Sequence, residues 1–362
     1  MRRRPFAGAT TRLALFTQSR TLLTRRCHAA GFERPAGAGC RSAQVVCWAR
    51  QRSSSAQFTL SRGLPAVISP YVRRLRLANE IRTRREAANL TSEELGKRIG
   101  QSRMKISRLE TGARRPDIGD VMKILDVLGV DGDKWRTLVQ VARDAAERGW
   151  WETPEFAGMG DRQKLYADLE CGATTIREYQ IFVPGLLQTR DYTRARRPRQ
   201  DKSEPFELER AVEARQRRQQ ELHREGGPSY QAVLDEVAVR RIAADPPIME
   251  AQLRRLVELA GANDRVAIRV LPVDAIVTEY RLPYSPFGIY TYADPGDPLI
   301  VVVDTVTTDI VLTEPEEVGP YVDLYEAIQT AALSARQSQE YLAQAVKNVP
   351  KMEKSRKEMT RP

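Results

Sequence analysis

The sequence predicts a multidomain protein in which an all-α domain is followed by a mixed α/β domain. Two patterns predict this fold class. Between residues 71 and 131 apolar residues recur every three or four positions, as in amphipathic helices, whereas between residues 161 and 350 strand-like segments are mixed with helical ones. A chain of 362 residues is long enough for two or three domains that fold without disulfides or metals.

The two ends of the chain differ from the rest in composition. Residues 1–70 contain 12 arginines and one acidic residue, Glu33, so their net charge of +11 equals that of the whole chain. We interpret residues 1–68 as a disordered or artefactual extension with the true start near Val67; a genuine tail or a targeting segment is the alternative. Residues 351–362 are expected to be a charged tail. Residues 71–130 carry 14 basic and 8 acidic side chains, so the all-α domain is basic.

An apolar stripe predicts the first helix of this domain. The helix should end near Asn89, because asparagine tolerates the left-handed conformation that often follows a helix. The positions of the stripe, three or four residues apart, are Leu75, Ala78, Ile81, Arg85 and Ala88.

Two further short helices are predicted from their capping residues. Thr91 and Glu94 match a capping box at the start of the second helix. Gly100 ends that helix, and Ser102 is the N-cap of a third helix that runs to about Glu110. A short helix, a tight glycine turn and another short helix form a helix-turn-helix.

The packing of this unit can also be predicted. Two helices that cross steeply need a small side chain where they approach, and Gly96 supplies it. A fourth helix should begin at Asp117 or Ile118 and end at Gly129. The residues expected to close a shared core are Leu95, Ile99, Ile106 and Leu109.

The third helix is strongly cationic. It carries Arg103, Lys105 and Arg108, and Arg114 and Arg115 follow it closely. A run of charge is often only a solvated helix face. Arginine on a helix is also able to read guanine O6 and N7 in the major groove, and cations beyond the helix meet phosphates. The complete helix-turn-helix register favours the second interpretation.

The segment from Leu75 to Val130 resembles the XRE (Cro/phage-repressor) class of helix-turn-helix domains, which are lambda-repressor-like. The resemblance rests on "LTSEELGKRIGQSRMKISRLETGARRPDIGDVMKILDVLGV", in which the small residue, the turn glycine, "ISRLETG" and the following proline fall in register. It implies that residues 102–110 lie in the major groove of double-stranded DNA. It also implies a homodimer on half-sites about 34 to 36 Å apart.

The resemblance assigns roles to residues of this chain. The base-contacting residues are Arg103, Met104 and Arg108, although Met104 is equally able to rest against the core. The phosphate-contacting residues are Ser92, Lys105 and Ser107, to which the charge argument adds Arg114 and Arg115. Arg85 and Glu110 match a partly buried structural ion pair.

The remainder is predicted to be a linker helix within residues 132–160 and a second domain over residues 161–350. In the second domain, "TTIREYQIF" is expected to be a strand that leads through Pro184 and Gly185 into a short helix, and "FELERAVEARQRRQQELHRE" a long helix. Further strands are predicted at 230–234, 266–271, 287–292, 299–303 and 309–312, and closing helices at 318–332 and 334–347.

This second domain resembles the uncharacterised C-terminal domain of actinobacterial XRE-type regulators of the WhiJ kind. The resemblance rests on "LECGATTIREYQIFVPGLLQTRDYTRA", "AVEARQRRQ", "YQAVLDEVAVRR", "VAIRVLP" and "PFGIYTYADPGDPLIVVVDT". It implies a role in development or secondary metabolism. It also implies a small acidic partner protein encoded nearby and a ligand-binding, partner-binding or dimerising function for this domain.

Composition argues against several kinds of enzyme. His28 and His223 are the only histidines, and only Cys171 of the four cysteines lies in the part that looks folded, so a zinc site, a Ser/His/Asp triad or a disulfide framework is not expected. No P-loop, dinucleotide-binding fingerprint or metal-ligand spacing is present, and no apolar run is long enough for a membrane span. We therefore expect no catalytic residues, no cofactor, no metal and no membrane partner.

Two features keep alternatives open. Asp235 and Glu236 follow a strand, and further aspartates surround "DPGDP", so catalysis by carboxylates is conceivable, although turns are rich in aspartate for local reasons. The "VPGLLQT" segment is either a core-facing loop or the lining of a small-molecule or peptide pocket. The further aspartates are Asp294, Asp297 and Asp304.

The expected function is that of a cytoplasmic, nucleoid-associated, sequence-specific transcriptional regulator that is not an enzyme. The first alternative is an antitoxin-like protein that holds a small partner and autoregulates its operon. The second is an enzyme fused to a DNA-binding module.

Overall fold

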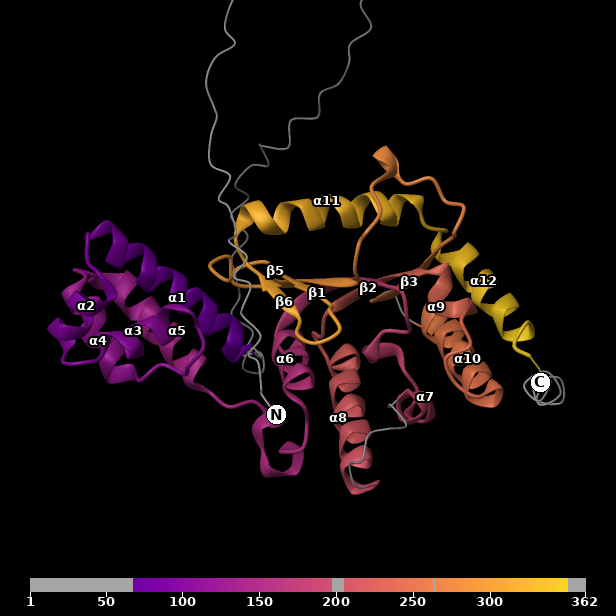
Figure 1. Ribbon diagram of the computed structural model, residues 1–362, viewed down its shortest axis with the longest axis horizontal. Helices are drawn as coiled ribbons and strands as arrows, with labels where there is room; N and C mark the ends of the chain where they lie inside the picture. Colours follow the sequence, from indigo (N-terminus) through magenta and orange to yellow (C-terminus); the bar gives the residue numbers. More distant parts are fainter. Residues whose placement is uncertain (1–67, 197–204, 263–264, 351–362) are drawn as a thin grey trace, which may run out of the picture. The chain divides into compact units, whose positions relative to one another are not determined.

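The computed structural model describes residues 68–196, 205–262 and 265–350. The extension over residues 1–67 and the tail over residues 351–362 lie outside these ranges, so the predictions for both are not addressed by it. In the described part a helical bundle comes first along the chain, and a sheet covered by helices follows it (Figure 1). The predicted fold class, an all-α domain and then a mixed α/β domain, is confirmed.

The bundle consists of five helices. They are α1 (Pro70–Ala87), α2 (Ser92–Ile99), α3 (Arg103–Glu110), α4 (Ile118–Val127) and α5 (Gly132–Ala146). The helix expected to be a linker, α5, packs in the same core as the other four. The buried apolar residues of this core are Leu77, Ile81, Leu95, Ile99, Ile106, Val121, Ile124, Leu125, Leu138, Val139, Val141 and Ala142.

The local signals in the sequence end and begin these helices as predicted. Asn89 follows α1 with φ 53°, and Gly100 ends α2 with φ 71°, both in the left-handed region. The capping box of Thr91 and Glu94 is formed in both directions, and Ser102 caps α3. These caps satisfy backbone groups that would otherwise lack partners at the helix ends.

The predicted stripe of α1 is partly wrong. Ala88 is exposed, whereas Leu77 is fully buried in the bundle core. The reason is that α1 packs against two different cores. Val72, near its first turn, lies in the core of the second domain, and Leu75 packs against that core too. A single stripe therefore does not describe the whole helix.

The second domain is built on one six-stranded sheet in the order β3-β2-β1-β4-β5-β6. Strands β1, β2 and β3 run parallel, and β4, β5 and β6 continue the sheet antiparallel. The strands are β1 (Ala173–Gln180), β2 (Ser229–Asp235), β3 (Val266–Leu271), β4 (Phe287–Tyr292), β5 (Ile300–Val303) and β6 (Ile310–Leu312).

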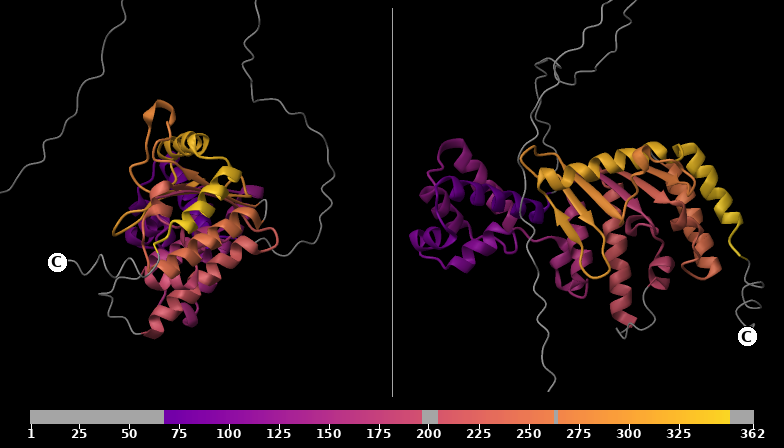
Figure 2. Two further views of the ribbon diagram at one scale, coloured as in Figure 1. Left: turned by 90° about the vertical axis from the view of Figure 1, so that its right-hand side faces the viewer. Right: turned by 45° about the horizontal axis from the view of Figure 1, so that its top comes forward.

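Helices cover both faces of this sheet. One face packs against α6 (Asp161–Glu170), α8 (Pro205–His223) and α10 (Pro246–Ala262), and the opposite face packs against α11 (Pro315–Ala331) (Figure 1). The right-hand view of Figure 2 also shows α11 and the salmon helices on opposite sides of the sheet. The shorter or peripheral helices are α7 (Arg190–Ala195), α9 (Glu236–Arg240) and α12 (Ala335–Lys347).

Side-chain alternation along the strands separates the two cores. Ile176 and Tyr230 face the α6–α8–α10 side, whereas Tyr179 and Val233 face α11. Each strand thus contributes every second residue to each layer, as the pleat requires. All the predicted strands are present, but α6, α9 and α10 were not predicted.

No helix in the described ranges is long and apolar enough to cross a membrane. Within the same ranges no three His, Cys, Asp or Glu side chains gather in a way that would hold a metal ion.

Candidate DNA-binding site

The helix-turn-helix is held together by a close backbone approach. A Cβ placed on Gly96 would lie 2.7 Å from the carbonyl oxygen of Gln101, closer than real Cβ contacts allow. The backbone N–H of Gln101 donates to Gly96 O at 2.8 Å across the same turn. The small residue predicted at this crossing is therefore needed where α2 meets the turn. This contact sets the direction in which α3 leaves.

The three predicted base-contacting residues lie on the exposed side of α3. Arg103 and Arg108 are exposed, and Met104 is 61 % exposed, whereas Ile106 on the other side is buried in the core. Neither Arg103 nor Arg108 forms a side-chain hydrogen bond or ion pair with any residue that the structure describes. Met104 does not rest against the core. Two guanidinium groups with free donors and one apolar side chain thus face solvent from one helix.

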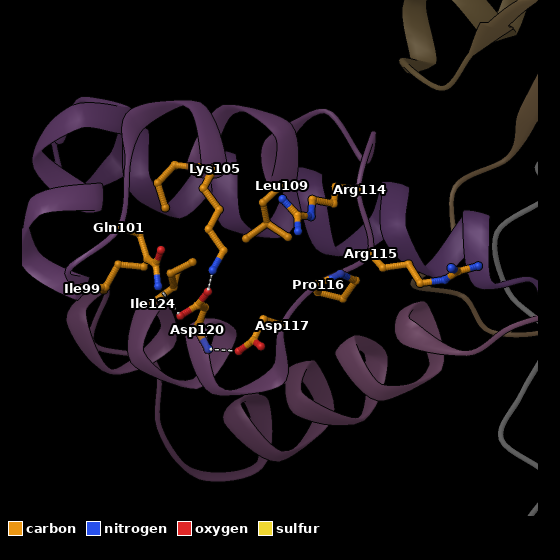
Figure 3. A pocket seen from close by; sticks show the side chains of 11 residues that line it. Ile99, Gln101, Lys105, Leu109, Arg114, Arg115, Pro116, Asp117, Asp120 and Ile124 are labelled. Carbon is orange, nitrogen blue, oxygen red and sulfur yellow. Dashed lines mark hydrogen bonds and ion pairs between the residues drawn. The ribbon is translucent and has the colours of Figure 1, made fainter.

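Lys105 is turned towards the protein itself. Its Nζ forms an ion pair with Asp120 in α4, and Gln101 Nε2 donates to the other oxygen of the same carboxylate at 2.9 Å (Figure 3). These residues line a hollow of about 20 Å³ beside α3, which is too small for anything larger than a water molecule. The predicted phosphate contact of Lys105 would have to compete with this ion pair.

Arg85 and Glu110 form a two-pronged ion pair that joins α1 to the end of α3. Arg85 Nε and Nη2 donate to Glu110 Oε1 at 2.6 Å and to Oε2 at 3.2 Å, and Nη1 donates to the carbonyl oxygen of Leu90 at 2.6 Å. The hydrogen bond with Glu110 raises the pKa of Arg85. Ser92 Oγ donates to Glu110 Oε2 at 3.3 Å, so its hydroxyl faces the ion pair.

The remaining predicted phosphate contacts differ in their surroundings. Ser107 and Arg114 are exposed, and no ion pair holds Arg114 within the described part of the chain. Arg115 forms an ion pair with Glu152, and its Nε donates to the carbonyl oxygen of Glu147 at 3.3 Å. Arg114 is therefore the more available of the two cations for a phosphate.

The carboxylates considered for catalysis have four separate sets of partners. Asp235 caps α9 and accepts a hydrogen bond from Tyr179, while Glu236 accepts from the backbone N–H of Val273 and from Tyr341. Asp294 and Asp297 pair with arginines of α1, and Asp304 accepts from Tyr166 and Gln180.

The capped α2, the glycine turn and the outward-facing cationic α3 define a helix-turn-helix DNA-binding domain. A comparison with protein families agrees, because the family described as "Helix-turn-helix domain" matches residues 76–138, which include the first part of α5. The family described as "Domain of unknown function (DUF5753)" matches residues 163–344, just over half of the chain. The chain belongs to this DUF5753 family. Comparisons with curated proteins and with solved structures found no match.

Proposed function

We propose that the protein is a sequence-specific transcriptional regulator that reads DNA with α3 in the major groove. The observation that carries this proposal is the pair Arg103 and Arg108, exposed on one helix and without side-chain partners among the described residues. A guanidinium group presents two parallel donors that match guanine O6 and N7. Met104 beside them has the apolar surface that a thymine methyl group requires.

Two of the predicted phosphate-contacting residues, Arg114 and Ser107, are able to bind a phosphate without giving up an internal partner. Lys105, Ser92 and Arg115 each hold an internal partner, so they bind phosphate only when that partner is exchanged. We therefore expect Arg114 to contribute more to non-specific affinity than Lys105 or Arg115.

The finer parts of the proposal rest on resemblance. A single helix-turn-helix presents a small surface, which supports binding as a homodimer to two half-sites one helical turn apart. The likeness of the second domain to WhiJ-type regulators supports control of development or secondary metabolism. It also supports the alternative, an antitoxin-like protein with a small acidic partner encoded nearby. Co-purification from the native cell would reveal such a partner. We propose no enzymatic activity.

The proposal is tested by selecting bound fragments from the organism's own DNA with the full-length protein, followed by titration of the selected site at two salt concentrations. Arg103→Ala and Arg108→Ala should each weaken specific binding by about 1 to 3 kcal/mol, roughly 5- to 150-fold, and relax the preference at one base pair. Arg114→Ala should weaken binding to all sequences and reduce the salt slope by about 1.

Arg336→Ala is the matched control, because Arg336 is 83 % exposed on α12 in the second domain and should leave DNA binding unchanged. Recovery of one short inverted repeat by the wild type and by this control supports a sequence reader. The proposal would be excluded if the wild type bound DNA weakly and without sequence preference, and if Arg103→Ala and Arg108→Ala bound as strongly as the wild type.

A further inference from the structure

A polar cavity lies in the second domain, far along the chain from the helix-turn-helix. It has a volume of about 130 Å³ and opens between β1, α6, α8 and the turn Gly185–Leu187. Most of the residues that line it carry polar groups, which is unusual beside the apolar core of a sheet. The residues that matter for its chemistry are Arg162, Tyr166, Glu178, Gln180, Arg215 and Asp304.

The floor of the cavity carries two buried polar residues in an otherwise apolar layer. Glu178 and Gln180 project from β1 on the same face as Ile176, and each is only 6 % exposed. Burying such groups costs free energy unless each finds a hydrogen-bond partner. Tyr230 donates to Glu178 Oε2 at 2.6 Å, and burial raises the pKa of Glu178 to about 8, so this carboxyl group is mostly neutral at pH 7.

Two buried polar atoms, one in the lining of the cavity and one on the same face of the sheet, have no partner among the described residues. Gln180 Nε2 donates to Asp304 at 3.4 Å, but nothing in the described ranges donates to Gln180 Oε1, and the hydroxyl of Tyr290 makes no hydrogen bond there either. The ring of Tyr290 lies against Gly288, where an added Cβ would come within 3.1 Å of it. Buried polar atoms without a partner, beside a cavity, match a ligand that supplies hydrogen-bond donors.

The other side of the cavity holds a guanidinium group without a counter-ion. Arg162 is paired with Asp309 and Arg218 with Glu170, but Arg215 has no carboxylate partner among the described residues. Its Nη1 donates to the neutral Gln188 Oε1 at 2.7 Å, and its Nε is buried without any described partner.

The position of Arg215 is fixed by the "VPGLLQT" turn. An added Cβ on Gly185 would lie 3.3 Å from Arg215 Nη1, so the glycine lets the guanidinium group lie against the backbone. Gln219 Nε2 donates to the carbonyl oxygens of Gly185 and Gln188 at 2.9 and 2.8 Å and ties the turn to α8. The segment faces the core in part, since Leu186 and Leu187 enter it, while Gly185 and Gln188 line the cavity.

We propose that this cavity binds a free α-amino acid with a short side chain. The Nε and Nη2 edge of Arg215 has no hydrogen-bond partner among the described residues, and its geometry matches a carboxylate held through two parallel hydrogen bonds. The ligand's ammonium group then donates to Gln180 Oε1 and faces the Asp304 carboxylate. A cavity of about 150 Å³ holds a molecule the size of benzene, so the volume here suits a small amino acid. A simple carboxylate such as acetate has no donor and would leave Gln180 Oε1 unsatisfied. This inference is independent of DNA binding.

The test uses the full-length protein in isothermal titration calorimetry and thermal unfolding, with each proteinogenic amino acid added singly. Acetate, methylamine and inorganic phosphate serve as comparison probes. At least one short-chain amino acid should bind and raise the Tm of the second domain by roughly 2 to 4 °C at a concentration well above its Kd. Arg215→Gln should weaken that binding at least about tenfold, as expected for a charge-assisted contact.

Arg217→Gln is the matched control, because Arg217 lies two residues away on α8 and is exposed. It should bind the amino acid as the wild type does. If Arg215→Gln unfolds, Gln180→Met tests the ammonium side of the site and should also weaken binding at least about tenfold. The proposal is overturned if no amino acid binds the wild type, if both variants bind it normally, or if acetate or phosphate binds as tightly through Arg215.

Discussion

At the scale of single residues, Glu178 is the least expected side chain in the structure. It lies on a strand, next to residues that form an apolar core, and its only hydrogen-bond donor among the described residues is Tyr230. Burial raises its pKa from an ordinary 4.5 to about 8. The cost of keeping a charge there is avoided by holding the proton.

This predicts a pH-dependent cost to stability. Between pH 4.5 and about 8 the unfolded chain has lost the proton of Glu178 while the native state keeps it, so the native state binds more protons and stability falls as pH rises. Glu178→Gln removes this dependence. Urea unfolding at pH 5 and pH 8 should show the variant gaining stability over the wild type at the higher pH, in the range of a few kcal/mol. If the free energy of unfolding differed between the variant and the wild type by the same amount at pH 5 and pH 8, the raised pKa of Glu178 would be contradicted.

At the scale of elements, the helix-turn-helix depends on the absence of a side chain at residue 96. Gly96→Ala places a Cβ against the turn carbonyl, and Gly96→Val adds two more carbons at the same spot. The valine variant should destabilise the bundle by about 1 to 3 kcal/mol and the alanine variant by less. Thermal unfolding and DNA titration should both follow this order. Equal stability of the valine variant and the wild type would show that the turn is free to move.

How far the sequence predicts these elements depends on how local their signals are. Asn89, Gly100 and the Thr91 capping box act within a few residues, and the helix ends were predicted correctly from them. Helix α10 was missed although its buried residues recur at helical spacing, so a signal was available there. Its fully or largely buried apolar residues are Met249, Leu253, Leu256 and Leu259.

Contacts between distant residues leave no such signal. The pairing of Lys105 with Asp120 turns a predicted phosphate contact inward, and nothing in the chain near either residue indicates it. The cavity is even harder to predict from the sequence, because its lining comes from α6, β1, the 185–187 turn, α8 and the end of β5. From the sequence, only the "VPGLLQT" segment was considered as the lining of a pocket, and Asp304 was considered as a catalytic carboxylate.

At the scale of the whole molecule, α6 touches both the cavity and α1. Arg162 and Tyr166 line the cavity, and Asp168, half a turn further on, accepts hydrogen bonds from Ser69 Oγ at 2.8 Å and from the backbone N–H of Tyr71 at 3.0 Å. These two residues are the N-cap and the second residue of α1. The helix that frames the cavity therefore also holds the start of the helix that supports α3 through Arg85 and Glu110.

This arrangement predicts that the amino acid and DNA influence each other's binding, if both proposals hold. A ligand that shifts α6 changes the Asp168 contacts with α1, and a coupling of 5- to 150-fold is typical of such linked sites, roughly 1 to 3 kcal/mol. Asp168→Ala removes the contacts but touches neither ligand, so it should reduce the coupling while each site alone keeps its affinity.

The measurement is the Kd for DNA with and without saturating amino acid, and the Kd for the amino acid with and without DNA, in the wild type and the variant. Linkage requires the two ratios to be equal in each protein. Equal DNA affinity with and without the amino acid would refute the coupling, and each site would then depend only on its own test. Full coupling in Asp168→Ala would show that the coupling is not transmitted through the contacts of α6 with α1.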